Sequence, residues 1–111
     1  AGAAAIVQPE MGHTGVTQFA RIAARARKDG AQVIPHATIG LGLFANASLR
    51  AGLAAGAEAH EFQHTIYPAN AALLDGAADC ENGAFRIPDS AGHGTIPNAA
   101  GMAHLKPLLS L

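Results

Sequence analysis

The sequence has 111 residues, enough for one small domain, and half of it is hydrophobic. Its net charge of −1 gives no electrostatic case for binding nucleic acid or an anionic membrane surface. No apolar run approaches the roughly 20 residues of a membrane-spanning helix. The lone Cys80 excludes an internal disulfide framework, so we expect a reducing, cytoplasmic location.

The first part of the chain predicts a strand followed by a helix. Ala3–Val7 is a short apolar run stopped by a nearby proline, as expected of a buried strand. A loop over Met11–Gly15 follows. Thr17 is a suitable N-cap for a helix over Gln18–Lys28, whose apolar residues recur at helical spacing. Gly30 supplies the helix stop.

The same alternation then repeats. Gln32–Pro35 predicts a second strand, and a glycine-rich loop follows over residues 37–42. A second helix is predicted over Leu43–Ala55 and a third strand over Glu58–Gln63. Strands that alternate with helices through short connections predict an α/β fold, with a parallel sheet and right-handed crossovers.

After residue 64 the alternation stops. Pro68–Leu74 predicts a short helix, and Cys80–Pro88 contains an Asn-Gly pair, which is a strong hairpin signal. Ser90–Asn98 is rich in loop-forming residues, and Met102–Leu109 predicts a terminal helix. We expect this last part of the chain to cover another part of the protein.

Ionisable side chains follow the first two predicted strands, and another lies within the third. Glu10, His36 and Glu61 are spaced by about one strand–helix unit, so parallel strands would bring them to one edge of the sheet. An imidazole gives and takes protons near neutral pH, and a carboxylate beside it fixes its tautomer. The pattern predicts an acid–base site in which His36 works with Glu10. His13, in the loop after the first strand, is expected to border it.

A different chemistry is open for residues 60–64, which satisfy the H-E-x-x-H pattern. On a helix, His60 and His64 would face one zinc ion and Glu61 would act as general base. On a strand, Glu61 would instead share a face with Gln63. A zinc hydrolase is therefore one alternative. A half-barrel that pairs with another chain and has no catalytic role is the second.

The most distinctive stretches of the chain are Gln8–Thr17, Val33–His36, His60–Gln63 and Ile87–Gly94. Their residues and order resemble the C-terminal end of the enolase superfamily, particularly the acid-sugar dehydratases of its mandelate racemase and muconate lactonizing enzyme branch. The resemblance implies the C-terminal portion of a modified TIM barrel, (β/α)7β, with a tail that returns to a capping domain. Residues 1–64 would supply the last three strands and two helices, and residues 65–111 the tail.

The resemblance also implies roles for individual residues. Members of the superfamily remove the proton α to a carboxylate and stabilise the resulting enediolate on Mg²⁺. His36 would then be the acid–base residue, Glu10 its dyad partner, and Glu61 a hydrogen-bond donor to the intermediate. His13 and Gln63 would contact the substrate. The family usually has Asp at the position of Glu10, so this dyad departs from the common pattern.

The resemblance places the Mg²⁺ ligands on earlier strands, outside this stretch of sequence. On that basis we expect the 111 residues alone to lack the metal and to be inactive. The substrate would be a sugar acid or another carboxylate, acted on by dehydration or racemisation. The full-length enzyme is expected to be a homo-oligomer, and the chain, which begins almost inside a strand, to be part of a longer polypeptide.

Overall fold

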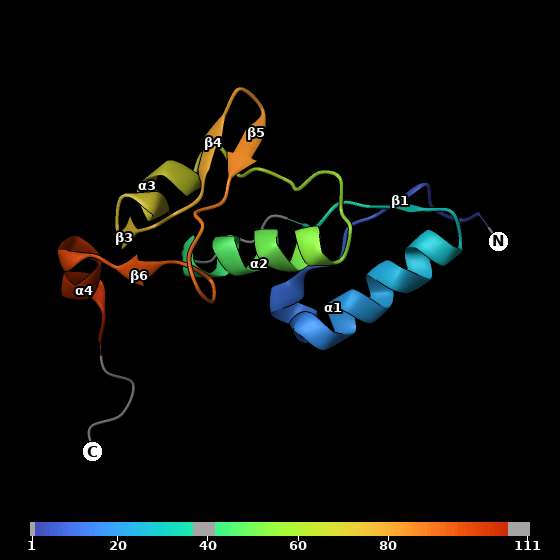
Figure 1. Ribbon diagram of the computed structural model, residues 1–111, viewed down its shortest axis with the longest axis horizontal. Helices are drawn as coiled ribbons and strands as arrows, with labels where there is room; N and C mark the ends of the chain where they lie inside the picture. The colour runs from blue at the N-terminus through green and yellow to red at the C-terminus, as the bar shows by residue number, and fades with distance from the viewer. Residues whose placement is uncertain (1, 37–41, 107–111) are drawn as a thin grey trace, which may run out of the picture.

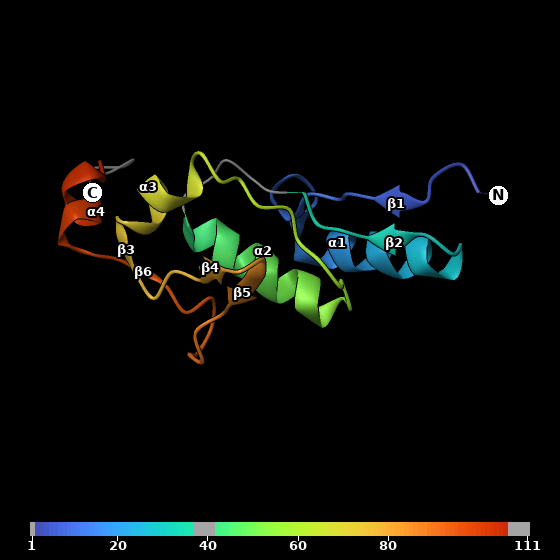
Figure 2. The same ribbon diagram turned by 90° about the horizontal axis from the view of Figure 1, so that it is seen from above.

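The computed structural model describes residues 2–36 and 42–106. The chain forms an elongated molecule in which α1, β1 and β2 lie at one end and the C-terminal elements at the other, with α2 between them (Figure 1). The view from above shows β1 and β2 passing along one side of α1 (Figure 2). The glycine-rich loop predicted over 37–42 falls almost wholly on residues 37–41, outside the described residues.

The predicted parallel strands are confirmed for the first pair. β1 (Ile6–Val7) pairs in parallel with β2 (Gln32–Val33), with Val7 opposite Val33. Backbone hydrogen bonds continue the alignment beyond the strands themselves, because the His36 N–H donates to the Pro9 carbonyl at 3.1 Å. The pairing therefore carries the chain in register to the residues that follow each strand.

The third predicted strand, Glu58–Gln63, does not form. The segment runs extended after α2, and one backbone hydrogen bond ties it to the second strand's chain, from the Glu61 N–H to the Pro35 carbonyl at 3.2 Å. A parallel ladder requires evenly spaced bonds along both chains. Glu58 and Ala59 are exposed here, so the start of the segment has little apolar surface to bury against the sheet.

Helix α1 (Met11–Lys28) begins earlier than predicted. The expected loop over its first residues is a helical turn, and the helix breaks at Gly15, whose φ of 72° and ψ of 159° are accessible to glycine almost alone. Thr17 therefore lies inside the helix and not at its cap. The first turn is held by the Thr14 hydroxyl, which donates to the Glu10 carbonyl at 2.9 Å.

The main core lies between α1 and the strands. Ala23 and Ala26 on the helix pack with Ala31 and Val33, and these four are buried. Small side chains allow the helix and sheet to approach closely. Close packing replaces the large apolar residues that this composition lacks.

Helix α2 (Gly42–Ala54) lies within one residue of its predicted bounds, and its buried residues include Leu49 and two polar side chains. Leu53 is 68% exposed, whereas Asn46 and Ser48 are fully buried. Buried polar side chains require hydrogen-bond partners, and both have them. This helix therefore uses polar contacts to hold its neighbours.

The C-terminal part contains short elements. Helix α3 (Tyr67–Ala71) confirms the predicted short helix but ends before Leu74, which lies in a strand. The hairpin of β4 (Asp79–Glu81) and β5 (Ala84–Arg86) confirms its prediction. Asn82 and Gly83 at the turn have φ of 51° and 76°. Positive φ at both central residues matches the type I′ geometry that an Asn-Gly pair favours.

Two further C-terminal predictions need correction. Part of the expected loop over Ser90–Asn98 is β6 (Ile96–Pro97), which pairs antiparallel with β3 (Leu74–Asp75). The last helix, α4 (Ala99–His104), begins before Met102 because the Asn98 side chain accepts a hydrogen bond from the Gly101 N–H at 2.9 Å. Residues 107–109 of the predicted helix lie outside the described residues.

A buried amide of α2 makes three hydrogen bonds to the C-terminal part. The Asn46 side-chain NH₂ donates to the Gly76 carbonyl at 2.9 Å and to the His93 carbonyl at 3.1 Å, and its oxygen accepts from the Ala78 N–H at 2.8 Å. Asn46 thus joins segments that lie far apart in the sequence.

Within the described ranges, no helix is long and apolar enough to cross a bilayer.

Candidate active site

The imidazole of His36 lies between two carboxylates from other segments of the chain. Its Nδ1 is 3.2 Å from Oε2 of Glu10, and its Nε2 is 3.7 Å from Oε2 of Glu61. The three residues come together because the extensions of β1 and β2 are hydrogen-bonded and the Glu61 segment is tied to Pro35. The proximity expected from the strand spacing is therefore present, although only two of the three segments are strands.

The surroundings of the two carboxylates differ. The Glu10 side chain is 16% exposed and the Glu61 side chain 36%, while the His36 ring is 46% exposed. A carboxylate is a hydrogen-bond acceptor, so Nδ1 of a neutral His36 carries a proton and donates a hydrogen bond to Glu10. Nε2 then holds the free lone pair, on the side of the ring that faces Glu61. The ring is thereby prepared to accept a proton at a known atom.

Two residues predicted to contact a substrate lie near this trio. The Nδ1 of His13 is 3.6 Å from Oε2 of Glu10, and the His13 side chain is 82% exposed. Gln63 is half-buried and lines the same small hollow as Glu61. His13 therefore borders the dyad in space, and a substrate-binding role for either residue stays a prediction.

The zinc alternative does not fit this geometry. Residues 60–63 are extended, so His60 and His64 do not share a helix face. Both ring nitrogens of His60 are engaged, with the Ser48 hydroxyl at 2.9 Å and the Glu61 backbone carbonyl at 2.7 Å.

A metal site of either kind requires several ligands that converge on one point. Across residues 2–36 and 42–106, no three His, Cys, Asp or Glu side chains are grouped so that they could hold a metal ion. These residues therefore do not build a magnesium site either.

Sequence reasoning missed the residues that support the trio. Ser48 contacts His60 from within α2, and Phe85 of the hairpin packs edge-on against the His60 ring, with centroids 5.9 Å apart. Phe62 and Tyr67 complete the aromatic cluster, their centroids 5.3 Å apart. A signal was present in the composition, because the few aromatic residues of this chain lie mostly after residue 60.

Burial lowers the pKa of the His60 imidazole below its usual value. As the pH falls, the unfolded chain therefore binds this proton before the folded protein does. The stabilisation from neutral His60 should be complete above the ordinary histidine pKa of about 6.5 and should be lost as the pH falls from there toward the lower folded-state value. Urea unfolding of the full-length protein across this range should show a steeper loss of stability in the wild type than in His60→Asn. Equal slopes would contradict the prediction.

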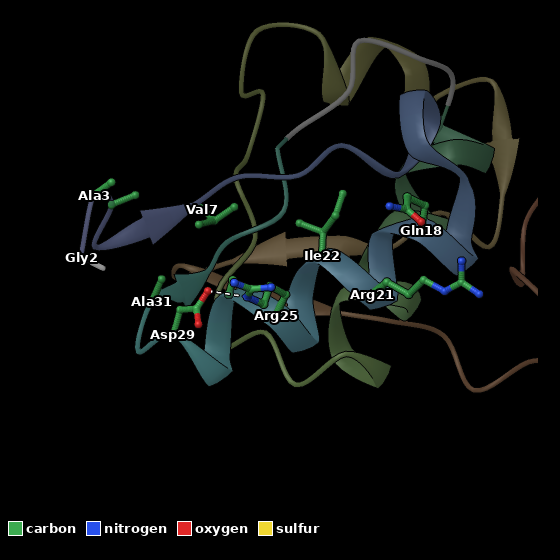
Figure 3. Close-up of a pocket in the computed structure, with 11 residues that line it drawn as sticks. Gly2, Ala3, Val7, Gln18, Arg21, Ile22, Arg25, Asp29 and Ala31 are labelled. Carbon is green, nitrogen blue, oxygen red and sulfur yellow. Dashed lines mark hydrogen bonds and ion pairs between the residues drawn. The ribbon is translucent and has the colours of Figure 1, made fainter.

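A separate pocket lies between α1 and the chain around β1, and no residue of this trio lines it. Gly2, Ala3, Val7 and Ala31 line it from the strand side, and Gln18, Arg21, Ile22 and the Arg25–Asp29 ion pair from the helix (Figure 3). Within the described residues β1 pairs with β2 alone. The other edge of β1, which borders this pocket, has no strand partner among these residues. No ionisable group of the candidate site contributes to it.

The fold and the site together define an α/β protein that presents a histidine–carboxylate pair beyond the ends of parallel strands. Residues 1–100 match the family described as enolase C-terminal domain-like. Since the match covers most of the chain, the protein belongs to this family, and the resemblance to the enolase superfamily is confirmed. No curated protein matches it.

Solved structures agree with this assignment. A Sinorhizobium meliloti protein provisionally named an isomerase is 51% identical, with a TM-score of 0.86 over 95% of this chain and 29% of its own. An enolase-superfamily member from Agrobacterium tumefaciens is 48% identical, with a TM-score of 0.80 over 89% of this chain and 26% of its own. A Zymomonas mobilis protein provisionally named a dehydratase is 25% identical, with a TM-score of 0.73 and the same coverage. This chain spans less than a third of the length of each.

Proposed function

We propose that this chain supplies the histidine–carboxylate dyad of an enolase-superfamily enzyme that removes the proton α to a carboxylate through an enediolate, as an acid-sugar dehydratase or racemase. The observation that carries the proposal is the His36 ring, held 3.2 Å from Glu10 and 3.7 Å from Glu61. Family membership and the isomerase and dehydratase names of the similar proteins support it.

Each member of the trio has a distinct task in this proposal. Glu10 accepts a hydrogen bond from the Nδ1–H and holds the ring in one tautomer, so Nε2 of His36 is the atom that takes or returns the substrate proton. In a dehydration, protonated Nε2 can also deliver a proton to a departing β-hydroxyl group. Glu61, beyond Nε2, would hydrogen-bond the carboxylate side of the intermediate.

The remaining parts of the proposed enzyme lie outside these residues. The described side chains do not group to hold a metal, so a magnesium ion would take its ligands from elsewhere in a longer protein. The (β/α)7β barrel, the contact between residues 65–111 and a capping domain, and a homo-oligomeric assembly belong to the same proposal. His13 and Gln63 would line the substrate side of the site.

The Glu10→Gln variant tests the dyad. A glutamine amide can donate to Nδ1 and so favour the wrong tautomer, which leaves Nε2 protonated and unable to act as a base. Exchange of the substrate α-proton in D₂O should fall by about 10²- to 10⁴-fold relative to the wild type. The full-length protein would be assayed by proton NMR over a panel of sugar acids.

His64→Asn is the matched control, because His64 is exposed and lies outside the trio. Its exchange rate should equal that of the wild type. Equal rates for Glu10→Gln and the wild type would remove Glu10 from the mechanism. If the wild type exchanges no substrate in the panel, the non-catalytic half-barrel alternative is favoured.

A further inference from the structure

The proton positions on the His60 ring follow from its partners. Nδ1 lies 2.7 Å from the backbone carbonyl of Glu61, and a carbonyl oxygen is only an acceptor. Nδ1 must therefore carry the proton. Nε2 of the neutral ring is then an acceptor, and it receives the hydrogen bond of the Ser48 hydroxyl at 2.9 Å. Ser48 is completely buried, so this contact is shielded from water.

The ring is fixed by separate parts of the chain. Ser48 belongs to α2, and Phe85 of β5 contacts the ring edge-on, with an interplanar angle of 79°. Burial also lowers the pKa of His60, which keeps the ring neutral and preserves Nε2 as an acceptor. The orientation of His60 is therefore set by its surroundings.

Both backbone polar groups of Glu61 are held by this arrangement. Its carbonyl accepts from His60, and its N–H donates to the carbonyl of Pro35, the residue directly before His36. These bonds fix the peptide units on both sides of the Glu61 Cα. The side chain that projects from this Cα places Oε2 3.7 Å from Nε2 of His36. Only the side-chain torsions of Glu61 lie between this fixed peptide and Nε2 of His36.

We propose that His60 is a positioning residue, and that its Nδ1–H holds the Glu61 peptide so that the Glu61 carboxyl group stays beside Nε2 of His36. The inference rests on the proposed function for its catalytic consequence. The hydrogen-bond chain itself is independent of which substrate is used. Misplacement of a catalytic group by about 1 Å can lower a rate by about 10²-fold, which is the scale on which such a support acts.

Two isosteric replacements in the full-length enzyme separate positioning from packing. An asparagine at 60 places its amide nitrogen near the position of Nδ1 and can still donate to the Glu61 carbonyl. A glutamine places its amide near Nε2 and loses that donation. Both remove the ring that Phe85 contacts. We expect His60→Gln to lower kcat by about tenfold or more with little change in KM, and His60→Asn to stay within about threefold of the wild type.

Equal losses in the two variants would overturn the proposal, because lost packing against Phe85 would then explain both. A double-mutant test in the Glu61→Gln background is the second test of the proposal. If His60 acts through the Glu61 carboxyl, adding His60→Gln to Glu61→Gln should change kcat little. Full additivity of the two losses would also overturn the proposal.

NMR of the wild type separates this inference from the proposed function. Nitrogen-15 spectra of labelled histidine should show His60 as the Nδ1–H tautomer, and the carbonyl ¹³C shift of Glu61 should change in His60→Gln but not in His60→Asn. An Nε2–H tautomer overturns the positioning role of His60 even in an active enzyme. A wild type that exchanges no substrate α-proton but shows these signals defeats the proposed function alone.

Discussion

Replacing His36 with asparagine should lower the rate of substrate α-proton exchange by about 10²- to 10⁴-fold, the range that a positioned general base contributes. The asparagine amide can still donate to Glu10 from near the position of Nδ1, so the local hydrogen bond is kept. It offers no lone pair at the position of Nε2 and cannot take a proton. The loss should therefore appear in kcat and leave the folded structure intact. Deuterium incorporation into the substrate, followed by NMR in the full-length protein, measures it directly.

The control for His36→Asn is the same change at His64. That ring is exposed, lies a few residues after Glu61, and is subjected to the same chemical substitution. Its rate should match the wild type. Turnover and exchange that survive in His36→Asn would show that another group removes the proton, and the proposed dyad would then be wrong.

Asn46→Ala should have the largest effect on stability among single changes in α2. Alanine leaves the carbonyls of Gly76 and His93 and the N–H of Ala78 without their partner. Of these three residues only Ala78 is buried, and a buried polar group left unsatisfied costs about 1–3 kcal/mol, so we expect a loss of that size in the free energy of unfolding. Urea denaturation of the full-length protein provides the measurement.

Leu53→Ala is the comparison on the same helix. It removes a larger apolar side chain than Asn46, but that side chain is 68% exposed. The change in stability should stay within about 0.5 kcal/mol. If the two variants lose similar amounts, the hydrogen bonds of Asn46 are not what holds the C-terminal part to α2.

Much of the site could be predicted because its signals are local. Pro9 and Pro35 each end a short apolar run, so the ends of β1 and β2 can be predicted from the sequence. Ionisable residues directly after those ends must then lie close together in a parallel pair. The contact of His36 with Glu10 follows from that logic, whereas Glu61 reaches His36 from a segment that forms no strand, and the chemical roles of all three stay predictions.

The rest depended on contacts between distant segments. Asn46 and Ser48 occupy the buried face of α2, and nothing in helical periodicity distinguishes a buried amide with three partners from an exposed one. The break at Gly15 was interpreted as a loop, because a helix that crosses a glycine in such a conformation has no periodic signature. The stretch around Glu61 has strand-like residues but makes no continuous ladder of backbone hydrogen bonds. Whether such a ladder forms depends on the neighbouring segments, not on the stretch itself.

The unpaired edge of β1 has a practical consequence for handling the protein. A free strand edge offers its N–H and C=O groups to any second chain, and here apolar side chains stand beside it. Samples in which this edge is uncovered are liable to self-associate through intermolecular sheet formation, and this self-association should increase with protein concentration. A charged or proline residue introduced along that edge would be the first remedy for a soluble preparation.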